Sequence, residues 1–163
     1  RPGLRLIRHD VDLCVVGGGL AGLCAAVSAA RHGAHVAIMQ ERPMLGGNAS
    51  SEVRMWVCGA HGPNNRETGL VEELNLENLY RNPGYNYSIW DGIMYEMARS
   101  EPNIELLMNC SCFDCEMDGA RIKSVRGWQI AENAVTQLFA CDTVGLYAMD
   151  VEAFFFQPFS KII

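Results

Sequence analysis

An apolar run passes directly into a glycine-rich turn in the stretch Leu13-Cys14-Val15-Val16-Gly17-Gly18-Gly19-Leu20-Ala21-Gly22. The small-residue segment that follows, 23–31, is typical of a helix, so the pattern predicts strand, tight turn and helix. Gly17, Gly19 and Gly22 fit the G-x-G-x-x-G spacing. The first glycine permits a sharp turn, the second lets backbone approach a pyrophosphate, and the third lets the helix pack close to the strand. The sequence therefore predicts a dinucleotide site at the start of this helix, where free N–H groups favour an anion.

The residues after the turn extend the same pattern. Gly33 stands where a helix over 20–32 would end, and the apolar run 34–39 predicts a second buried strand. Glu41 follows the last glycine by about 20 residues, where an acid can accept hydrogen bonds from the ribose hydroxyls. The alternative is a glycine-rich turn in another α/β protein, with Glu41 merely solvated. Strand, helix, strand and acid in this order favour the dinucleotide site.

The composition is that of an ordinary globular domain. The chain has 163 residues, of which 49% are hydrophobic and 20% charged, and this is enough for one domain with its own core. The net charge of −6 argues against broad nucleic-acid binding, because no basic field is available to neutralise phosphates. No apolar run approaches the roughly 20 residues of a membrane span, and no signal peptide is recognised. We therefore expect a cytoplasmic protein.

The cysteines offer a second chemistry to weigh. There are seven of them: Cys14, Cys24, Cys58, Cys110, Cys112, Cys115 and Cys141. An odd number, with two inside apolar segments, favours reduced, buried thiols over a disulfide framework. The spacing Cys110-x-Cys112-x-x-Cys115 also fits a redox pair or half of a metal site. It precedes an Asp-Gly hairpin signal rather than a helix, and no second pair of ligands follows, so we predict ordinary strand cysteines and no metal.

Two segments flank the predicted strand–helix–strand unit. Residues 1–10 are expected to form a lead outside the sheet. Residues 42–65 form a long loop rich in glycine and proline, which would lie over the carboxyl ends of the strands, where ligands bind in an open α/β sheet. A plain surface connection is the alternative, but loops of this length are usually functional or disordered, and Trp56 and the glycines argue against disorder.

Apolar residues at helical spacing predict two further helices, over 66–81 and 88–99. We expect their apolar stripes to lie in the core. In the second helix, Ser88 and Asp91 have the spacing of a capping box. The run 104–109 then predicts a third parallel strand.

The remainder predicts an antiparallel ribbon. Asp118-Gly119 between two alternating runs is a strong hairpin signal. After about residue 131 the pattern weakens, and we leave 141–163 as an unassigned tail. The predicted fold is an α/β, Rossmann-like domain over 11–140. It has packed helices, a ribbon on the other side, and a parallel sheet built from strands near 11–16, 35–40 and 104–109.

Residues 11 to about 128 resemble the amino-terminal part of the FAD-dependent oxidoreductases of the glutathione-reductase-like superfamily. The resemblance is carried by the extended glycine fingerprint at 15–26, by Glu41-Arg42 and by the double glycine Gly46-Gly47. In this family the double glycine lies close to the FAD pyrophosphate and the flavin. The resemblance implies FAD as the cofactor, bound by Gly17, Gly18, Gly19, Leu20, Ala21, Gly22, Glu41, Arg42, Gly46, Gly47, Asn48, Ser50 and Cys112.

The same resemblance implies a role for each part of this set. The fingerprint glycines and the double glycine would hold the pyrophosphate, and Glu41 the adenosine ribose, with Arg42 beside the adenine or ribose. The segment 48–51 would approach the isoalloxazine ring. Cys112 stands where family members usually have a valine whose backbone reads the adenine edge, a role that does not need the valine side chain.

The resemblance also implies a longer protein. Members have a second, strand-rich substrate domain and a late Gly-Asp segment that holds the ribityl chain. Here 139–145 matches the family's Ala-Thr-Gly region only faintly, and the late Gly-Asp segment is absent. We therefore expect a fragment or truncated form. An NAD-binding module without flavin is a second hypothesis, which Gly46-Gly47 and the long loop count against. A non-catalytic remnant is a third, which the missing Gly-Asp segment favours.

The implied reaction is hydride transfer between an unknown small-molecule substrate and the flavin. The residues of the long loop that could face a substrate are Glu52, Arg54, Cys58 and His61. His61 could donate a proton, and Arg54 could hold a carboxylate. An exposed loop histidine and a surface arginine are the favoured alternatives, so no catalytic residue is assigned.

Overall fold

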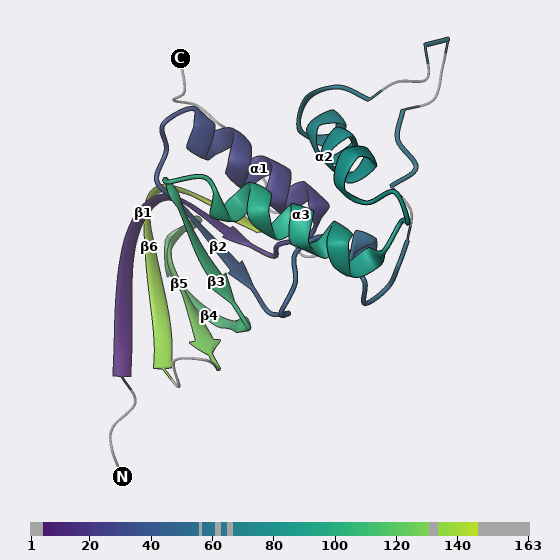
Figure 1. Cartoon of the computed structure of the whole chain (residues 1–163). Coiled ribbons are helices and arrows are strands. Elements are labelled where there is room, and N and C mark those ends of the chain that lie inside the picture. The colour runs from purple at the N-terminus through teal and green to yellow at the C-terminus, as the bar shows by residue number, and fades with distance from the viewer. Residues whose placement is uncertain (1–4, 56, 61–62, 65–66, 131–133, 147–163) are drawn as a thin grey trace.

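A six-stranded sheet organises the computed structural model, which describes residues 5–55, 57–60, 63–64, 67–130 and 134–146 (Figure 1). Across the sheet the strands run in the order β3-β2-β1-β6-β5-β4. Their bounds are β1 (Arg5–Val16), β2 (Val36–Gln40), β3 (Ile104–Met108), β4 (Cys110–Asp118), β5 (Arg121–Gln129) and β6 (Ala134–Leu146). The strand that leads into the glycine turn, β1, therefore lies inside the sheet.

The parallel half of the sheet aligns the strand ends. β1 pairs in parallel with β2, from Leu13 opposite Val36 to Val16 opposite Met39. β2 pairs in parallel with β3, and β1 with β6. All five residues of β2 are buried, as expected for a parallel strand covered on both faces. The predicted parallel sheet and its three strands are confirmed, and their carboxyl ends meet at one edge.

Helices cover one face of this sheet. In the described part of the chain they are α1 (Leu20–Arg31), α2 (Gly69–Arg81) and α3 (Tyr87–Arg99), with a short 3₁₀ turn η1 (Gly47–Ala49) between β2 and α2. The core on this face joins Leu23 and Val27 of α1 to Val15 and Ile38 of the sheet and to Met94 of α3, all without measurable exposure. The predicted helices are confirmed.

The β4–β5 ribbon continues the sheet, since β5 pairs antiparallel with β6, and it folds over the face of β1 and β2 that the helices do not cover. Val125 and Cys110 of the ribbon pack with Cys14, Ala37 and Met39 in a second, smaller core. The ribbon turns where Asp118 pairs with Arg121, and Gly119 there has a φ of 61°. The predicted antiparallel ribbon on the other side of the sheet is thus confirmed, and β1 and β2 lie between two apolar layers.

Both ends of the predicted domain differ from expectation. Residues 5–10 are not a lead outside the sheet, because they form the first half of β1 and pair with 134–139 of β6. The segment after 131 also continues the fold, since β6 runs through 134–146 and takes in the first residues of the predicted tail. This pairing joins segments more than a hundred residues apart, so no local pattern reveals it. Residues 147–163 lie outside the described residues.

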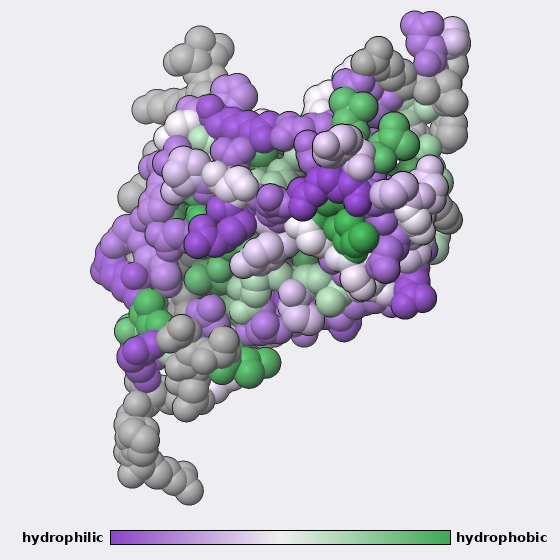
Figure 2. Space-filling model, in the orientation of Figure 1, coloured by the Kyte–Doolittle hydropathy of each residue, from purple (hydrophilic) through white to green (hydrophobic). Residues whose placement is uncertain are grey.

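The apolar stripe of α2 is only partly in the core. Leu74 is buried, but Leu76 and Leu79 are 58% and 65% exposed, so the expectation of a fully buried stripe is wrong. The reason is that α2 packs mainly against α3 and α1, and not directly on the sheet. Figure 2 shows hydrophobic side chains at the surface over α2, separated by hydrophilic ones.

The start of α3 also differs from expectation. Asn86 is the cap, because its side-chain oxygen accepts a hydrogen bond from the Ser88 backbone N–H at 2.8 Å. Asp91 does not close a capping box with Ser88. Its carboxylate instead accepts from the Ser51 backbone N–H at 2.9 Å, so it fastens α3 to the loop that follows η1.

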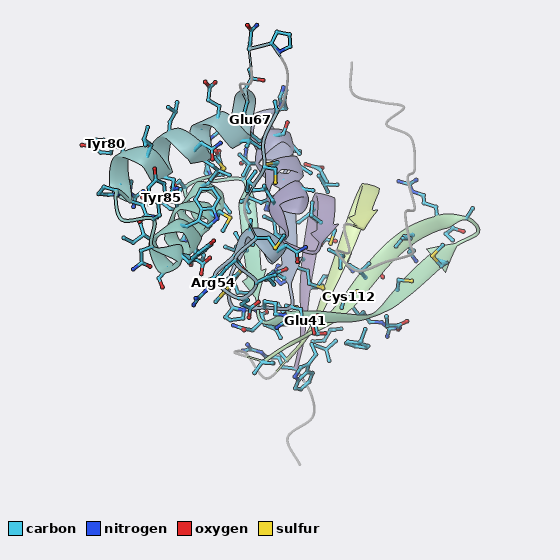
Figure 3. All side chains as sticks on the ribbon, turned by 90° about the vertical axis from the view of Figure 1, so that its right-hand side faces the viewer. Glu41, Arg54, Glu67, Tyr80, Tyr85 and Cys112 are labelled. Carbon is cyan, nitrogen blue, oxygen red and sulfur yellow. The ribbon has the colours of Figure 1, made fainter. Side chains whose placement is uncertain are left out.

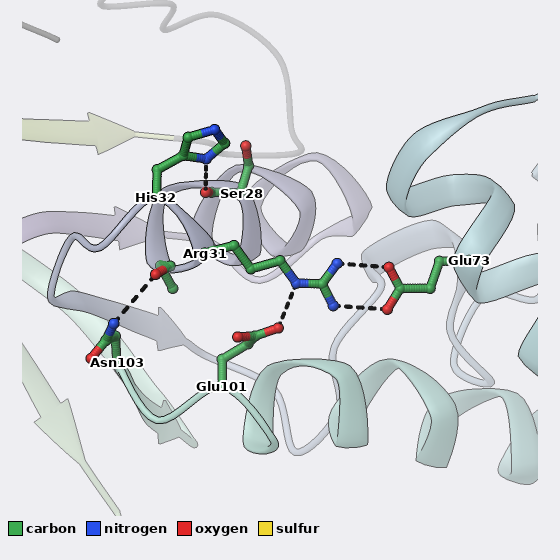
Figure 4. Close-up of polar contacts among 7 residues, drawn as sticks. Ser28, Arg31, His32, Glu73, Glu101 and Asn103 are labelled. Carbon is green, nitrogen blue, oxygen red and sulfur yellow. Dashed lines mark hydrogen bonds and ion pairs between the residues drawn. The ribbon is translucent and has the colours of Figure 1, made fainter. Parts of the chain in front are cut away.

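An arginine at the end of α1 links the helices (Figure 4). The Arg31 guanidinium donates from Nη1 and Nη2 to the two Glu73 carboxylate oxygens of α2, at 2.7 and 2.8 Å. Its Nε donates to Glu101, just after α3, at 2.6 Å. One side chain thereby fixes the last turn of α1 relative to both other helices.

Candidate functional site

A cleft of about 540 Å³ opens at the carboxyl ends of β1 and β2, beside the start of β4. Its walls come from four separate segments: the end of β1, the end of β2, the loop around η1 and the first residues of β4. The residues that line it are Val16, Gly17, Gly19, Met39, Gln40, Glu41, Arg42, Gly47, Asn48, Glu52, Val53, Cys110, Ser111 and Cys112. This is the end of a parallel sheet at which ligands bind.

The turn between β1 and α1 has the geometry that the glycine spacing predicts. Gly17 has a φ of 104°, a conformation that favours glycine. A Cβ on Gly22 would stand 2.0 Å from the Gly17 carbonyl oxygen, so only glycine permits this approach of helix to strand. Gly19 caps α1 without a side-chain hydrogen bond, and the first turn holds no acid. No side chain caps the N–H groups at this helix end, which is therefore suited to an anion.

Glu41 and Arg42 extend from the end of β2 into the mouth of the cleft. Figure 3 shows Glu41 beside Cys112, while Tyr80 and Tyr85 lie apart on the helical side. Arg42 forms an ion pair with Glu52 across the cleft, with 3.5 Å between Nη1 and Oε1. Since the Arg42 side chain is 64% exposed, this pair is weak and can open for a ligand.

A second glycine loop lies against the first. The Gly46 backbone N–H donates to the Gly18 carbonyl at 2.8 Å, and Gly19 and Gly46 form a parallel bridge. Ser50 is fully buried, and its hydroxyl donates to the Gly47 carbonyl at 2.6 Å. The double glycine is thus held next to the fingerprint glycines. The buried Ser50 stabilises the turn at Gly47 through this hydrogen bond.

The thiols near the cleft are packing groups. Burial raises the pKa of the Cys14 thiol to about 12 and that of Cys110 to about 11, and it also raises the pKa of Cys112. The buried thiols of Cys14 and Cys110 are protonated at neutral pH and are poor nucleophiles. Cys58, Cys112 and Cys115 are exposed, so the expectation of buried thiols is wrong for these three. Within the described ranges, no group of three or more potential metal ligands is arranged around one point.

The predicted site residues divide into two groups. Those that line the cleft are Gly17, Gly19, Glu41, Arg42, Gly47, Asn48 and Cys112. Those that stand behind it are Gly18, Leu20, Ala21, Gly22, Gly46 and Ser50, which shape the turn, the helix start or the second loop. Sequence reasoning missed six lining residues: Val16, Met39, Gln40, Val53, Cys110 and Ser111. For all of them except Val53, the position at a strand end next to predicted site residues was the available signal.

Of the loop residues considered for chemistry, Glu52 lines the cleft. Arg54 has a φ of 62°, and its guanidinium lies 5.6 Å from the centre of the Tyr87 ring, on α3. Cys58 is exposed. Trp56 and His61 lie outside the described residues, so the hypothesis that His61 donates a proton stays a prediction.

Comparisons with known sequences identify proteins that are similar to this chain. A family model described as FAD dependent oxidoreductase matches residues 12–142. The soluble pyridine nucleotide transhydrogenase of Chromohalobacter salexigens is 45% identical over 76 residues, which are 47% of this chain and 16% of that protein. The chain thus spans only a small part of this relative's length.

Solved structures share the fold at low sequence identity. L-proline dehydrogenase from P. horikoshii matches with a TM-score of 0.52 and 20% identity, over 88% of this chain and 23% of that one. A quinol fumarate reductase from E. coli matches with a TM-score of 0.59 and 15% identity, over 86% of this chain and 33% of that one. The myxobacterial halogenase CndH, a variant of FAD-dependent halogenases, matches with a TM-score of 0.56 and 16% identity, over 85% of this chain and 37% of that one.

Among the described helices, none has the length and apolar character to cross a bilayer.

Proposed function

Because the chain belongs to the FAD dependent oxidoreductase family, we propose that its cleft holds the adenosine diphosphate half of FAD. The observation that carries this proposal is the meeting of two glycine loops and Glu41, at the end of β2, around a single cleft. Gly17, Gly19 and the first turn of α1 would hold the pyrophosphate. Glu41 would accept hydrogen bonds from the adenosine ribose.

The other residues that line the cleft would contact the adenine, the ribose and the diphosphate. Arg42 would lie beside the adenine or ribose and exchange its exposed contact with Glu52 for the ligand. The backbone at Cys112, at the start of β4, would read the adenine edge. Gly47 and Asn48 also line the cleft and would face the diphosphate and the flavin side.

When bound, FAD supplies the acceptor or donor of a hydride. We propose that the whole protein transfers hydride between this flavin and a small-molecule substrate. The part of the chain described here carries the cofactor-binding portion, which we propose corresponds to the predicted domain over 11–140 together with the rest of β1 and β6.

The seven cysteines support a reducing, cytoplasmic location, and the net charge of −6 argues against nucleic acid as a partner.

The test is a titration of the purified chain with FAD, followed by the absorption and fluorescence of the flavin. We expect saturable binding and a shift of the flavin bands. Glu41→Ala should weaken binding by roughly 10- to 100-fold, because a hydrogen bond to a charged group contributes about 1.5–3 kcal/mol. Glu67→Ala, which changes an acid that does not line the cleft, is the matched control and should bind as the wild type does.

The competing hypotheses give other results. Displacement of FAD by ADP, but not by nicotinamide mononucleotide, would locate the adenosine half as proposed. Tight binding of NAD with no uptake of FAD would support the NAD-binding module. A folded chain that takes up neither would support the non-catalytic remnant.

A further inference from the structure

Gln40, the last residue of β2, connects the two glycine loops. Its side chain is almost fully buried, with 6% exposure. The side-chain Oε1 accepts a hydrogen bond from the Gly18 backbone N–H at 2.7 Å, and Nε2 donates to the Met44 carbonyl at 2.8 Å. One amide group thus contacts the β1–α1 turn with its acceptor and the 41–46 loop with its donor.

We propose that Gln40 is a positioning residue that fastens the two loops into one cradle before FAD enters. The inference rests on the proposed function, since it concerns how the same cleft is prepared for the pyrophosphate. The direct bond from Gly46 N–H to the Gly18 carbonyl is the third link between the loops. Gly18 therefore has both of its backbone polar groups engaged, the N–H by Gln40 and the carbonyl by Gly46.

The chemistry of the amide explains why glutamine suits this position. The site requires an acceptor and a donor on one planar group, and the neutral amide of glutamine offers both. A carboxylate could accept from Gly18 but would face the Met44 carbonyl with a second acceptor. An apolar side chain would leave the buried Gly18 N–H and the partly buried Met44 carbonyl without the Gln40 amide as a partner, which is costly.

The consequence for binding is preorganisation. Gly17 and Gly19 line the cleft from one loop, and Gly47 lines it from the other. A ligand that contacts both loops binds more tightly when they are already fixed relative to each other, because less ordering accompanies binding. Gln40 would therefore act on affinity through Gly18 and the second loop, and its neighbour Glu41 would contact the ligand directly.

The first experiment compares wild type with Gln40→Met, which keeps length and volume and removes both hydrogen bonds. Amide hydrogen exchange is measured in the FAD-free chain, and FAD affinity by calorimetry. We expect the Gly18 and Gly46 amides to exchange at least roughly tenfold faster, and FAD to bind roughly tenfold or more weakly, as the loss of about one or two hydrogen bonds implies.

Asn82→Leu is the matched control. Asn82 is also buried and uses its amide for three hydrogen bonds, to Asn78 and to the Asn86 backbone. It lies in the turn between α2 and α3, away from the cleft. This variant should lower the Tm, while the exchange of Gly18 and Gly46 and the affinity for FAD stay as in wild type.

Gln40→Glu gives a second, pH-dependent readout. As a carboxylate it loses the bond to Met44, whereas the protonated acid can donate to Met44 and accept from Gly18. Protection of the Gly46 amide in the FAD-free variant should therefore rise as the pH falls through the pKa of this carboxyl, beyond any change in wild type. Because FAD is absent, repulsion from its phosphates plays no part in this result.

The outcomes separate the inference from the proposed function. If wild type and Gln40→Met bind FAD equally well, or Gly18 exchange is the same in both, the positioning role is overturned. If wild type takes up no FAD, the proposed function fails, and the exchange data alone decide whether Gln40 fastens the loops. Faster exchange with weaker binding, confined to the Gln40 variants, supports the proposal.

Discussion

The carbonyl oxygen of Gly17 stands only 2.0 Å from the place that a Cβ on Gly22 would occupy. The start of α1 therefore approaches the end of β1 more closely than any other residue type would allow. Because Val15 is also within 3.2 Å of that point, the helix cannot relax sideways without disturbing the core. This contact sets the position of the helix end that faces the cleft.

Gly22→Ala should accordingly destabilise the chain and weaken FAD binding together. Insertion of a methyl group into a packed contact costs about 1–3 kcal/mol, and the shift of α1 would move its N–H groups from the pyrophosphate. Denaturant unfolding and FAD titration measure the two effects. Gly92→Ala is the control, because a Cβ there meets nothing within 4 Å and should stabilise α3 by about 0.5–1 kcal/mol. Equal stability of the two variants would contradict the prediction.

FAD should protect Cys112 from thiol reagents. Cys112 lines the cleft, while Cys58 and Cys115 are exposed outside its walls. Saturating FAD is expected to slow the labelling of Cys112 by N-ethylmaleimide and to leave the other two unchanged, as followed by mass spectrometry of peptides. Uniform labelling rates with and without FAD would mean that the adenosine half does not reach β4.

The Arg31–Glu73 pair should contribute stability that depends on pH. The hydrogen bonds from Arg31 lower the pKa of the Glu73 carboxyl below its usual value of 4.5. A lowered pKa stabilises the folded state above the unfolded-state pKa, and this contribution is lost as the pH falls. Both side chains are about 40% exposed, so the expected loss is below about 1 kcal/mol.

Unfolding of wild type and Glu73→Gln between pH 7 and pH 3 checks this contribution. The difference in stability between them should shrink as the pH falls below about 4.5, where Glu73 begins to be protonated in the unfolded chain. Glu77→Gln is the control, because Glu77 lies 3.8 Å from Arg81 in a looser pair. A constant difference between wild type and Glu73→Gln over the whole range would refute the prediction.

Residues 5–10 should be required for stability. They pair with β6, and the Nδ1 atom of His9 on this segment contacts the Glu105 carboxylate of β3. A chain that starts at Val11 should lose about 1–2 kcal/mol, a fall in Tm of roughly 2–8 °C for a domain of this size. A chain that starts at Arg5 should melt as the full chain does. Identical melting of all three would show that the first half of β1 adds nothing to the sheet.

The local pattern around the glycine turn determined much of this protein. Gly17, Gly19 and Gly22 predicted a strand, a turn and a helix because each step depends on neighbours within a few residues. The same holds for the Asp118-Gly119 hairpin and for the end of α1 at Gly33. Glu41 and Arg42 were found at the mouth of the cleft, because in an open α/β sheet the ends of adjacent parallel strands share one edge.

Tertiary structure alone decided how distant segments meet. Nothing local to residues 5–10 or 134–146 shows that they pair, since each gains its partner only when the sheet closes around β1. The exposure of Leu76 and Leu79 likewise depends on how much of α2 the other helices cover. Gln40 reads in the sequence as one polar residue beside an acid, and its two partners, Gly18 and Met44, become evident only when both loops are folded. Periodicity and spacing determine elements, whereas long-range pairing and buried hydrogen bonds depend on the assembled chain.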